Sequence, residues 1–268
     1  MRFKVIDIHT HAWPQKISQK ARERLESLFR VNMVADPTID TLLKYMDKNS
    51  IDISVVCSVA TRPEQVKPIN DWAVSIRNQR IRVFCSFHPD DKNWRSELKR
   101  IKDKGDGIKM QPEFQGFYVD EERIFSIYDE IESLGIPILF HCGHELSGTM
   151  LVHSSPERIK RLKRKFPALK IIAAHFGGFK LWDDVERFLL GSDVYLDTSY
   201  FFRYLEPEVI KKFLKNHPKN RILFGTDFPL IDQSEDIGYL EKLDIPLELK
   251  ERIFYKNAKE LLKNNISA

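Results

Sequence analysis

Residues 5–11 read Val5-Ile6-Asp7-Ile8-His9-Thr10-His11, a short apolar run that leads directly into a pair of histidines. A near-continuous apolar run of this length is typical of a strand buried on both faces of a parallel sheet. An open doubly wound sheet would place a glycine-rich turn after its first strand. The His-x-His pair at that position therefore favours another kind of parallel sheet, and the runs that follow indicate which kind.

Seven more apolar runs follow this first one, and amphipathic segments separate them. The predicted strands are 4–8, 53–59, 82–87, 107–110, 137–142, 170–175, 193–197 and 221–225. The predicted helices are 40–48, 69–79, 94–104, 121–134, 156–166, 181–190 and 207–216, with closing helical segments in 247–264. Eight strand–helix units in 268 residues are typical of an α/β (β/α)8 TIM barrel, which takes about 250 residues. We expect one catalytic domain over residues 1–268.

Composition limits the classes of partner. Lys and Arg number 43 against 39 for Asp and Glu, so the net charge is only +4, and the charges are interspersed rather than gathered into the basic patch of a nucleic-acid binder. No apolar run reaches the roughly 18 residues of a membrane span, and the first residues lack the apolar stretch of a signal peptide. The three cysteines indicate a reduced, intracellular protein. We expect a cytoplasmic protein, a homodimer if it assembles, that acts on a small molecule without a nucleic-acid or membrane partner.

Residues that bind metals stand at the ends of four predicted strands. His9 and His11 end the first strand, His141 the fifth, His175 the sixth, and Asp227 follows the eighth. In a barrel these ends meet at one rim, where active sites form. Imidazole nitrogens and a carboxylate oxygen suit a catalytic zinc ion, which lowers the pKa of a coordinated water to about 7.

The residues divide into ligands, proton carriers and substrate contacts. His9, His11, His141 and Asp227 are the candidate metal ligands, and Asp227 can also accept the proton of the attacking water. His175 is a candidate to polarise the carbonyl or orient that water, with a fifth ligand and a structural histidine as alternatives. Among residues near the strand ends, Lys109 is a candidate to bind substrate and Arg62 and Arg203 to bind its carboxylate; the alternative for each arginine is an ordinary surface residue.

As a set, these motifs resemble the amidohydrolase superfamily of metal-dependent barrels. The matching pieces are Ile8-His9-Thr10-His11, Gly107-Ile108-Lys109, Phe140-His141-Cys142-Gly143, Ala174-His175-Phe176-Gly177-Gly178 and Phe224-Gly225-Thr226-Asp227-Phe228-Pro229. They are similar to the amidohydrolase-related group that includes aminocarboxymuconate-semialdehyde decarboxylase, aromatic-acid decarboxylases and lactone hydrolases. The resemblance implies that His9, His11, His141 and Asp227 hold one divalent ion, usually zinc, and that His175 is catalytic. Manganese and iron suit the same ligands.

Several functions remain open on this site. The first is hydrolysis of an amide, ester or lactone of a small carboxylated substrate, and the second is non-oxidative decarboxylation of an aromatic or unsaturated acid. A TatD-type nuclease is a third, although it requires a Glu after the fourth strand and residues 109–112 supply none. A non-catalytic metal-binding barrel is the fourth. Lys109 lies on the fourth strand, which in dinuclear members of the superfamily carries a carbamylated lysine that bridges two metal ions. The favoured alternative is a lysine that pairs with a carboxylate or binds substrate.

Overall fold

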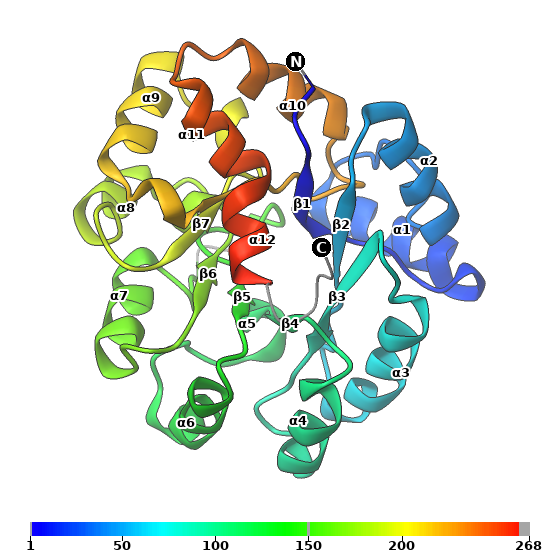
Figure 1. The fold of residues 1–268 in the computed structure, drawn as a ribbon. Coiled ribbons are helices and arrows are strands. Elements are labelled where there is room, and N and C mark those ends of the chain that lie inside the picture. The colour runs from blue at the N-terminus through cyan, green and yellow to red at the C-terminus, as the bar shows by residue number, and fades with distance from the viewer. Residues whose placement is uncertain (1, 149–150, 263–268) are drawn as a thin grey trace.

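Eight parallel strands form the centre of the molecule in a computed structural model that describes residues 2–148 and 151–262 (Figure 1). Each strand pairs with the next one along the chain, so the order in the sheet is the order in the sequence. The strands are β1 (Ile6–Thr10), β2 (Ile53–Cys57), β3 (Ile81–Ser86), β4 (Gly107–Met110), β5 (Ile138–Phe140), β6 (Ile171–Ala173), β7 (Tyr195–Asp197) and β8 (Ile222–Leu223).

Backbone hydrogen bonds join the last strand to the first. Ile8 N donates to Phe224 O at 2.9 Å, and Asp227 N donates to His9 O at 2.8 Å. These bonds bring the segment after β8 alongside β1 and close the sheet into a ring. The predicted (β/α)8 TIM barrel is confirmed.

Helices surround the barrel, as Figure 1 shows. The α-helices are α1 (Gln15–Phe29), α2 (Ile39–Asn49), α3 (Val66–Ile76), α4 (Trp94–Lys102), α5 (Pro112–Gln115), α6 (Phe125–Leu134), α7 (Pro156–Lys165), α8 (Trp182–Phe188), α9 (Pro207–Asn216), α10 (Gln233–Lys242), α11 (Leu247–Glu251) and α12 (Asn257–Leu261). Short turns of helix are η1 (Pro63–Gln65), η2 (Glu122–Ile124), η3 (His175–Gly177), η4 (Phe201–Arg203) and η5 (Lys219–Arg221), and η6 (Arg252–Lys256) is a π-helical segment between α11 and α12. The sequence analysis did not predict α1, α5 or α10.

The apolar core has two layers. One lies between the strands and the surrounding helices and is the larger. The other fills the barrel, where Ile6, Ile8 and Leu223 pack with residues of the other strands and with Ala258 and Leu261 of α12. Helix α12 therefore closes the end of the barrel at which the strands begin. The opposite end, where the strands finish, is left for polar residues.

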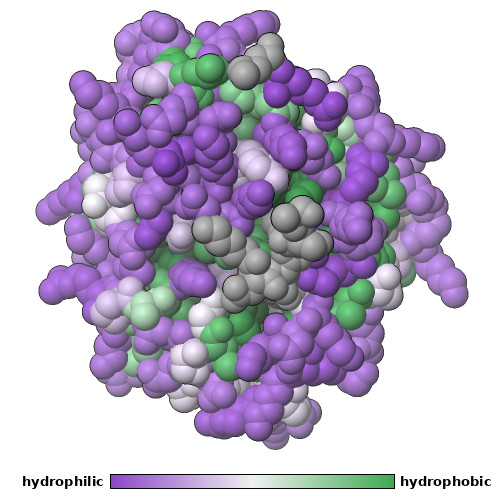
Figure 2. Space-filling model, viewed as in Figure 1, coloured by the Kyte–Doolittle hydropathy of each residue, from purple (hydrophilic) through white to green (hydrophobic). Residues whose placement is uncertain are grey.

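The surface shown in Figure 2 is mainly hydrophilic, with apolar side chains in small separate groups. No helix in residues 2–148 and 151–262 is both long and apolar enough to cross a membrane. Cys57, Cys85 and Cys142 are free and buried, as expected of core residues. Cys142 lies in the layer between strands and helices, the side on which alternation along the chain predicted it.

Candidate metal centre

An irregularity in β1 aims two histidines at the same point. The pairing of β1 with β2 shifts register between Asp7 and Thr10, and such a bulge re-aims the side chains around it. Ile8 packs in the barrel interior, while His9 and His11 both reach Asp227. The Oδ1 atom of Asp227 lies 2.9 Å from His11 Nε2 and 3.5 Å from His9 Nε2. The donor atoms of these three side chains all lie within 4.8 Å of one another.

Asp7 ties β1 to the loop that carries Asp227. Its buried carboxylate accepts hydrogen bonds from Thr226 N at 3.1 Å, Thr226 Oγ1 at 2.7 Å and Gln233 Nε2 at 2.8 Å. Burial raises the pKa of Asp7 to about 7 although these bonds act in the opposite direction. Asp227 itself has a backbone φ of 66°, which is uncommon for a residue other than glycine. The loop is therefore held in a conformation that Asp227 would rarely adopt alone.

Asp197, at the end of β7, orients His9. His9 Nδ1 lies 3.0 Å from Asp197 Oδ2, and both side chains are buried. A carboxylate can only accept, so Nδ1 carries the hydrogen and Nε2 is left with a free lone pair. Burial would raise the pKa of Asp197, but His9 outweighs it and holds that pKa below its usual value. A buried carboxylate behind a histidine is a common support for a metal ligand.

His11 is oriented in the same way by a backbone carbonyl. Its Nδ1 lies 2.8 Å from Cys57 O, which can only accept, so the Nε2 atom again holds the free lone pair. Two imidazole lone pairs and a carboxylate oxygen of Asp227 therefore face one another. An ion bound among these three acceptors has to be positive, and a divalent ion fits this donor set.

The charges at the cluster match that requirement. Burial would raise the pKa of Asp227, but His9 and His11 hold it well below its usual range, so the carboxylate is ionised. Burial lowers the pKa of His9, and the nearby charge of Lys109 lowers it further, which keeps the ring neutral. The buried Lys109 Nζ lies 3.3 Å from His9 Nε2 and brings one positive charge to the cluster.

His175 and His141 belong to a chain of hydrogen bonds that begins at Asp197. Ser199 Oγ donates to Asp197 Oδ1, and His175 Nδ1 lies 2.8 Å from Ser199 Oγ. His175 Nε2 lies 3.0 Å from His141 Nδ1. Because the serine gives its hydrogen to the carboxylate, His175 donates to it through Nδ1 and accepts from His141 through Nε2. We call Asp197, Ser199, His175 and His141 the Asp197 relay.

The relay fixes the protonation of both rings. Burial lowers the pKa of His175 to about 4. Burial, together with the neighbouring His175 and Lys109, also holds the pKa of His141 well below its usual value. Both rings are neutral at pH 7. With its Nδ1 hydrogen donated to His175, His141 has a lone pair on Nε2, and that buried atom makes no hydrogen bond in the described residues.

His141 lies beside Glu145 and Glu113, whereas His9 lies beside Asp197 and Asp227. Its Nε2 atom lies 3.2 Å from Glu145 Oε1, and the donor atoms of His141, Glu145 and Glu113 lie within 4.8 Å of one another. Burial raises the pKa of Glu145 to about 8, and the charge of Glu113 adds to this rise. The structure thus gathers His9, His11 and Asp227 in one set of donors and places His141 in another.

The predicted substrate contacts lie in different settings. Lys109 is inside the cluster. Arg62 is exposed, with Nε 2.9 Å from Glu64 Oε1, and Arg203 has Nη2 2.8 Å from Glu235 Oε2. The arginines are engaged by neighbouring acids in this structure, and their contact with substrate stays a prediction.

Sequence reasoning missed three residues of the site: Asp197, Ser199 and Glu113. Asp197 ends an apolar strand, which is the signal that identified the other strand-end residues, so the same reasoning could have found it. Glu113 follows directly on the segment 109–112 that was searched for an acid. Ser199 carries no signal in its neighbouring sequence.

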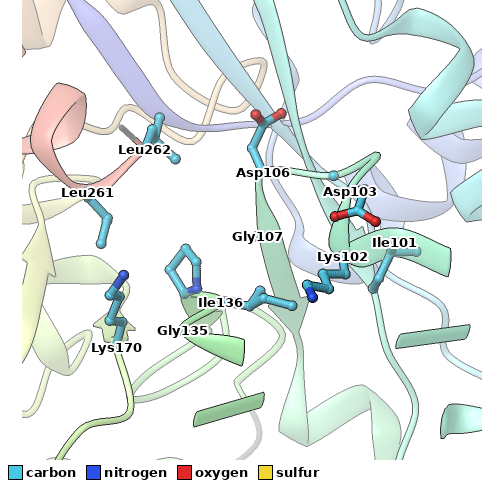
Figure 3. A pocket seen from close by; sticks show the side chains of 12 residues that line it. Ile101, Lys102, Asp103, Asp106, Gly107, Gly135, Ile136, Lys170, Leu261 and Leu262 are labelled. Atoms are coloured by element: carbon cyan, nitrogen blue, oxygen red, sulfur yellow. The ribbon is translucent and has the colours of Figure 1, made fainter. Parts of the chain in front are cut away.

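A pocket at the other end of the barrel is separate from this cluster. It lies where β4 and β5 begin, and Figure 3 shows Ile136, Lys170, Leu261 and Leu262 around it. Active sites in TIM barrels form where the strands end. We therefore assign no part of the predicted site to this pocket.

The sequence matches one family model, described as Amidohydrolase, over residues 6–263. No curated protein matches it. Solved structures do: an uncharacterised TIM-barrel protein from Bordetella bronchiseptica is 18% identical, with a TM-score of 0.74 over 97% of this chain and 98% of the other. The 2,6-dihydroxybenzoate decarboxylase from Rhizobium is 17% identical, with a TM-score of 0.75 over 98% and 100% of the two chains.

A third similar structure contains a metal ion. It is 5-carboxyvanillate decarboxylase from Novosphingobium aromaticivorans, complexed with manganese and 4-hydroxy-3-methoxy-5-nitrobenzoic acid. It is 16% identical, with a TM-score of 0.77 over 97% of this chain and 96% of the other. At these identities the likeness establishes a shared fold.

Proposed function

The chain belongs to the amidohydrolase family of metal-dependent enzymes, and from that premise we propose that it hydrolyses an amide, ester or lactone bond in a small carboxylated substrate. The observation that carries the proposal is the convergence of His9 Nε2, His11 Nε2 and Asp227 Oδ1, three acceptors that face one another at the rim of the barrel. These residues, with His141 as the fourth predicted ligand, would hold one divalent ion, with zinc expected and manganese or iron as alternatives.

A divalent ion held there supplies a Lewis acid, which makes water more acidic and polarises a carbonyl group. Asp227 stays ionised because of the histidines around it, so it can take a proton from the attacking water. His175 is neutral and lies next to the cluster, with its ring centre 5.5 Å from that of His9. It moves a proton when it exchanges its bond to His141 for one to the substrate.

Lys109 is the proposed partner of the substrate carboxylate. Its side chain is buried, and its Nζ lies in the cluster, 3.3 Å from His9 Nε2, whereas Arg62 is exposed. A carboxylate bound to Lys109 would place the rest of a small substrate beside Asp227 and His175. Arg203 remains a proposed second contact at the edge of the site.

Decarboxylation on the same residues is the second candidate. Two barrels of the same fold are decarboxylases of hydroxybenzoic acids, and one of them is complexed with manganese. In this alternative Lys109 would hold the carboxylate that leaves as CO₂, and the proton that replaces it on carbon would come from water by way of Asp227 or His175. The two reactions use the same side chains, but hydrolysis releases or exposes an acid, whereas decarboxylation releases CO₂.

Elemental analysis combined with a substrate screen tests both candidates. Purified wild type, His9→Ala and Asp227→Ala are analysed for metal, with His217→Gln as control because His217 binds Val194 O where β7 begins, at the opposite end of the barrel. We expect the ion at the cluster to be lost in both site variants and retained in the control. Lactones, esters, amides and hydroxybenzoic acids are then screened for ring opening or acid release against release of CO₂. A protein that binds no divalent ion under any loading condition would refute the proposal.

A further inference from the structure

One buried carboxylate serves two histidines that have different proposed roles. Asp197 Oδ2 lies 3.0 Å from His9 Nδ1, so it contacts that ring directly. The other oxygen, Oδ1, reaches His175 through the hydroxyl of Ser199, which donates to Oδ1 and lies 2.8 Å from His175 Nδ1. Asp197 and Ser199 are fully buried, so bulk water does not compete for these bonds.

The chain turns after β7 so that this hydroxyl lies beside the carboxylate. Ser199 N donates to Asp197 Oδ1 at 3.1 Å, as in the turns that an aspartate side chain forms with the backbone two residues on. His175 N donates to the same oxygen at 3.1 Å. In residues 2–148 and 151–262, the Asp197 carboxylate makes no hydrogen bond to the ring of His175. The Ser199 hydroxyl therefore links that carboxylate to the ring.

Ser199 acts as an acceptor towards His175. A hydroxyl has one hydrogen and a carboxylate can only accept, so the serine gives its hydrogen to Asp197 and offers a lone pair to His175 Nδ1–H. The same oxygen lies 3.4 Å from His9 Nδ1, but that nitrogen is closer to Asp197 Oδ2. The ring contact of His175 with Tyr200, 5.6 Å between centroids, does not distinguish the two nitrogens. Hydrogen bonds therefore decide which nitrogen carries the hydrogen.

One of the two hydrogen bonds of the His175 ring is lost in the proposed reaction. Nε2 accepts from His141 Nδ1 at 3.0 Å, and the ring exchanges this bond for one to the substrate. The bond from Nδ1–H to Ser199 then keeps the hydrogen on Nδ1 and leaves the lone pair on Nε2. Without the serine hydroxyl, Nδ1–H would be buried without this acceptor, and the tautomer with the hydrogen on Nε2 would be favoured.

From this geometry we infer that Ser199 is a positioning residue for His175, because it fixes the tautomer in which Nε2 can take a proton. The inference rests on the proposed function for the role of His175 and adds a residue that acts through it. Since Asp197 contacts His9 directly, loss of the Ser199 hydroxyl should disturb the proton carrier and leave the metal ligand in place.

The tautomers are read from ¹⁵N chemical shifts of histidine-labelled protein, stripped of metal so that no ligand bond fixes the tautomer of His141. His175→Gln identifies the His175 signals by their loss. In Ser199→Ala the ratio of the Nδ1–H to the Nε2–H tautomer of His175 should fall by about tenfold or more, because a buried donor without an acceptor is costly. The His9 signals should keep their wild-type tautomer, which shows that the fold and Asp197 are intact.

Further variants separate the hydroxyl from the space that it fills. Ser199→Thr keeps a hydroxyl and should keep the tautomer, whereas Ser199→Cys, a weak acceptor of similar size, should shift it. Ser192→Ala is the matched control, because Ser192 donates to Leu189 O before β7 begins, at the opposite end of the barrel. With a substrate from the screen, Ser199→Ala should lower kcat about 10–100-fold with unchanged KM and bound metal, and Ser199→Thr should restore kcat.

Two outcomes overturn the inference and leave the proposed function standing. In the first, His175 keeps its wild-type tautomer in both Ser199→Ala and Ser199→Cys while the His9 signals are unchanged. In the second, the tautomer shifts but kcat and KM stay at their wild-type values, so that Ser199 has a structural role alone. A wild-type protein that binds no ion and converts no substrate refutes the proposed function instead, and the ¹⁵N shifts still decide whether Ser199 fixes the tautomer.

Discussion

Replacing Asp197 with asparagine should weaken binding of the proposed metal ion without removing any of its ligands. The carboxylate accepts from His9 Nδ1 at 3.0 Å through Oδ2, and from His175 N and Ser199 N, each at 3.1 Å, through Oδ1. An asparagine that keeps its oxygen on the backbone donors turns its NH₂ group towards His9 Nδ1–H. Two donors then face each other, and relief requires the His9 hydrogen to move to Nε2, where it blocks the metal.

The loss should be about 10–100-fold in metal affinity, which is the usual effect of removing such a support. That range corresponds to about 1.4–2.7 kcal/mol. The opposite orientation of the asparagine keeps the His9 bond and leaves two backbone N–H groups facing an NH₂, which costs about 1–3 kcal/mol of stability for each unsatisfied group. The first orientation therefore predicts weaker metal binding, and the second predicts lower stability of the metal-free protein.

Competition with a chromophoric chelator for Mn²⁺ measures the affinity, and thermal unfolding of the metal-free protein measures the stability. Asp244→Asn is the matched control, since Asp244 is exposed in the loop after α10. If Asp197→Asn binds Mn²⁺ within twofold of wild type and unfolds at the same temperature, Asp197 does not fix the tautomer of His9.

Three more predictions concern other parts of the structure. His175→Gln should lower turnover by about 10²–10⁴-fold while the amount of bound metal stays unchanged. If the variant lost its metal as well, His175 would be a metal ligand instead. Gly143→Ala should lower the melting temperature, because the added Cβ would lie 2.1 Å from Phe179 N at a φ of 92°; an unchanged melting curve would contradict the structure there. The pKa of the buried Asp236 is raised to about 8 by burial, so its neutral form stabilises the fold below about pH 4 and that stability is lost as the pH rises through 8. Asp236→Asn should therefore unfold at a higher temperature than wild type at pH 9 and at a similar one at pH 4, and a difference that does not depend on pH would refute this pKa.

Much of the barrel is predictable because its strands are short and apolar. The segment 107–110 was predicted with the bounds that β4 has, and α9 likewise coincides with its predicted range. The prediction 137–142 was too long, because β5 ends at Phe140 and His141 already belongs to the rim. His141 N still donates to Met110 O at 3.1 Å, so the ladder fades rather than ends sharply, and composition alone does not reveal that point.

Two of the three unpredicted helices, α1 and α10, differ in the signal that their sequences carry. Helix α1 has apolar residues at helical spacing, Ile17, Ala21, Leu25 and Leu28, so its pattern was recognisable in the sequence although the helix buries only Ser18 and Phe29. Helix α10 buries the polar Gln233 and Asp236 together with Leu240, and its signal is the Asp232 side chain, which accepts from Ser234 N at its start. Helices that pack through polar groups leave little periodicity in the sequence.

The site was predictable where it follows strand ends and unpredictable where it depends on side-chain partners. The strand-end pattern predicted that His9, His11 and Asp227 would lie at one rim, and their side chains do lie together, with the unforeseen bulge in β1 helping to aim the two histidines. The association of His141 with Glu113 and Glu145 depends on how two loops pack. Single-sequence patterns carry no information on such contacts between distant segments.

The seam between β1 and β8 has a consequence for synthesis of the protein. Asp7 and Thr226, which meet at this seam, are 219 residues apart in the chain. While the ribosome is still making the first seven strands, His9 and His11 have no Asp227 to share an ion with. Capture of the proposed ion would wait until the segment after β8 emerges and the ring closes. The ion would then join the first strand made to the last one, and its loss would weaken the barrel at the seam that closes last.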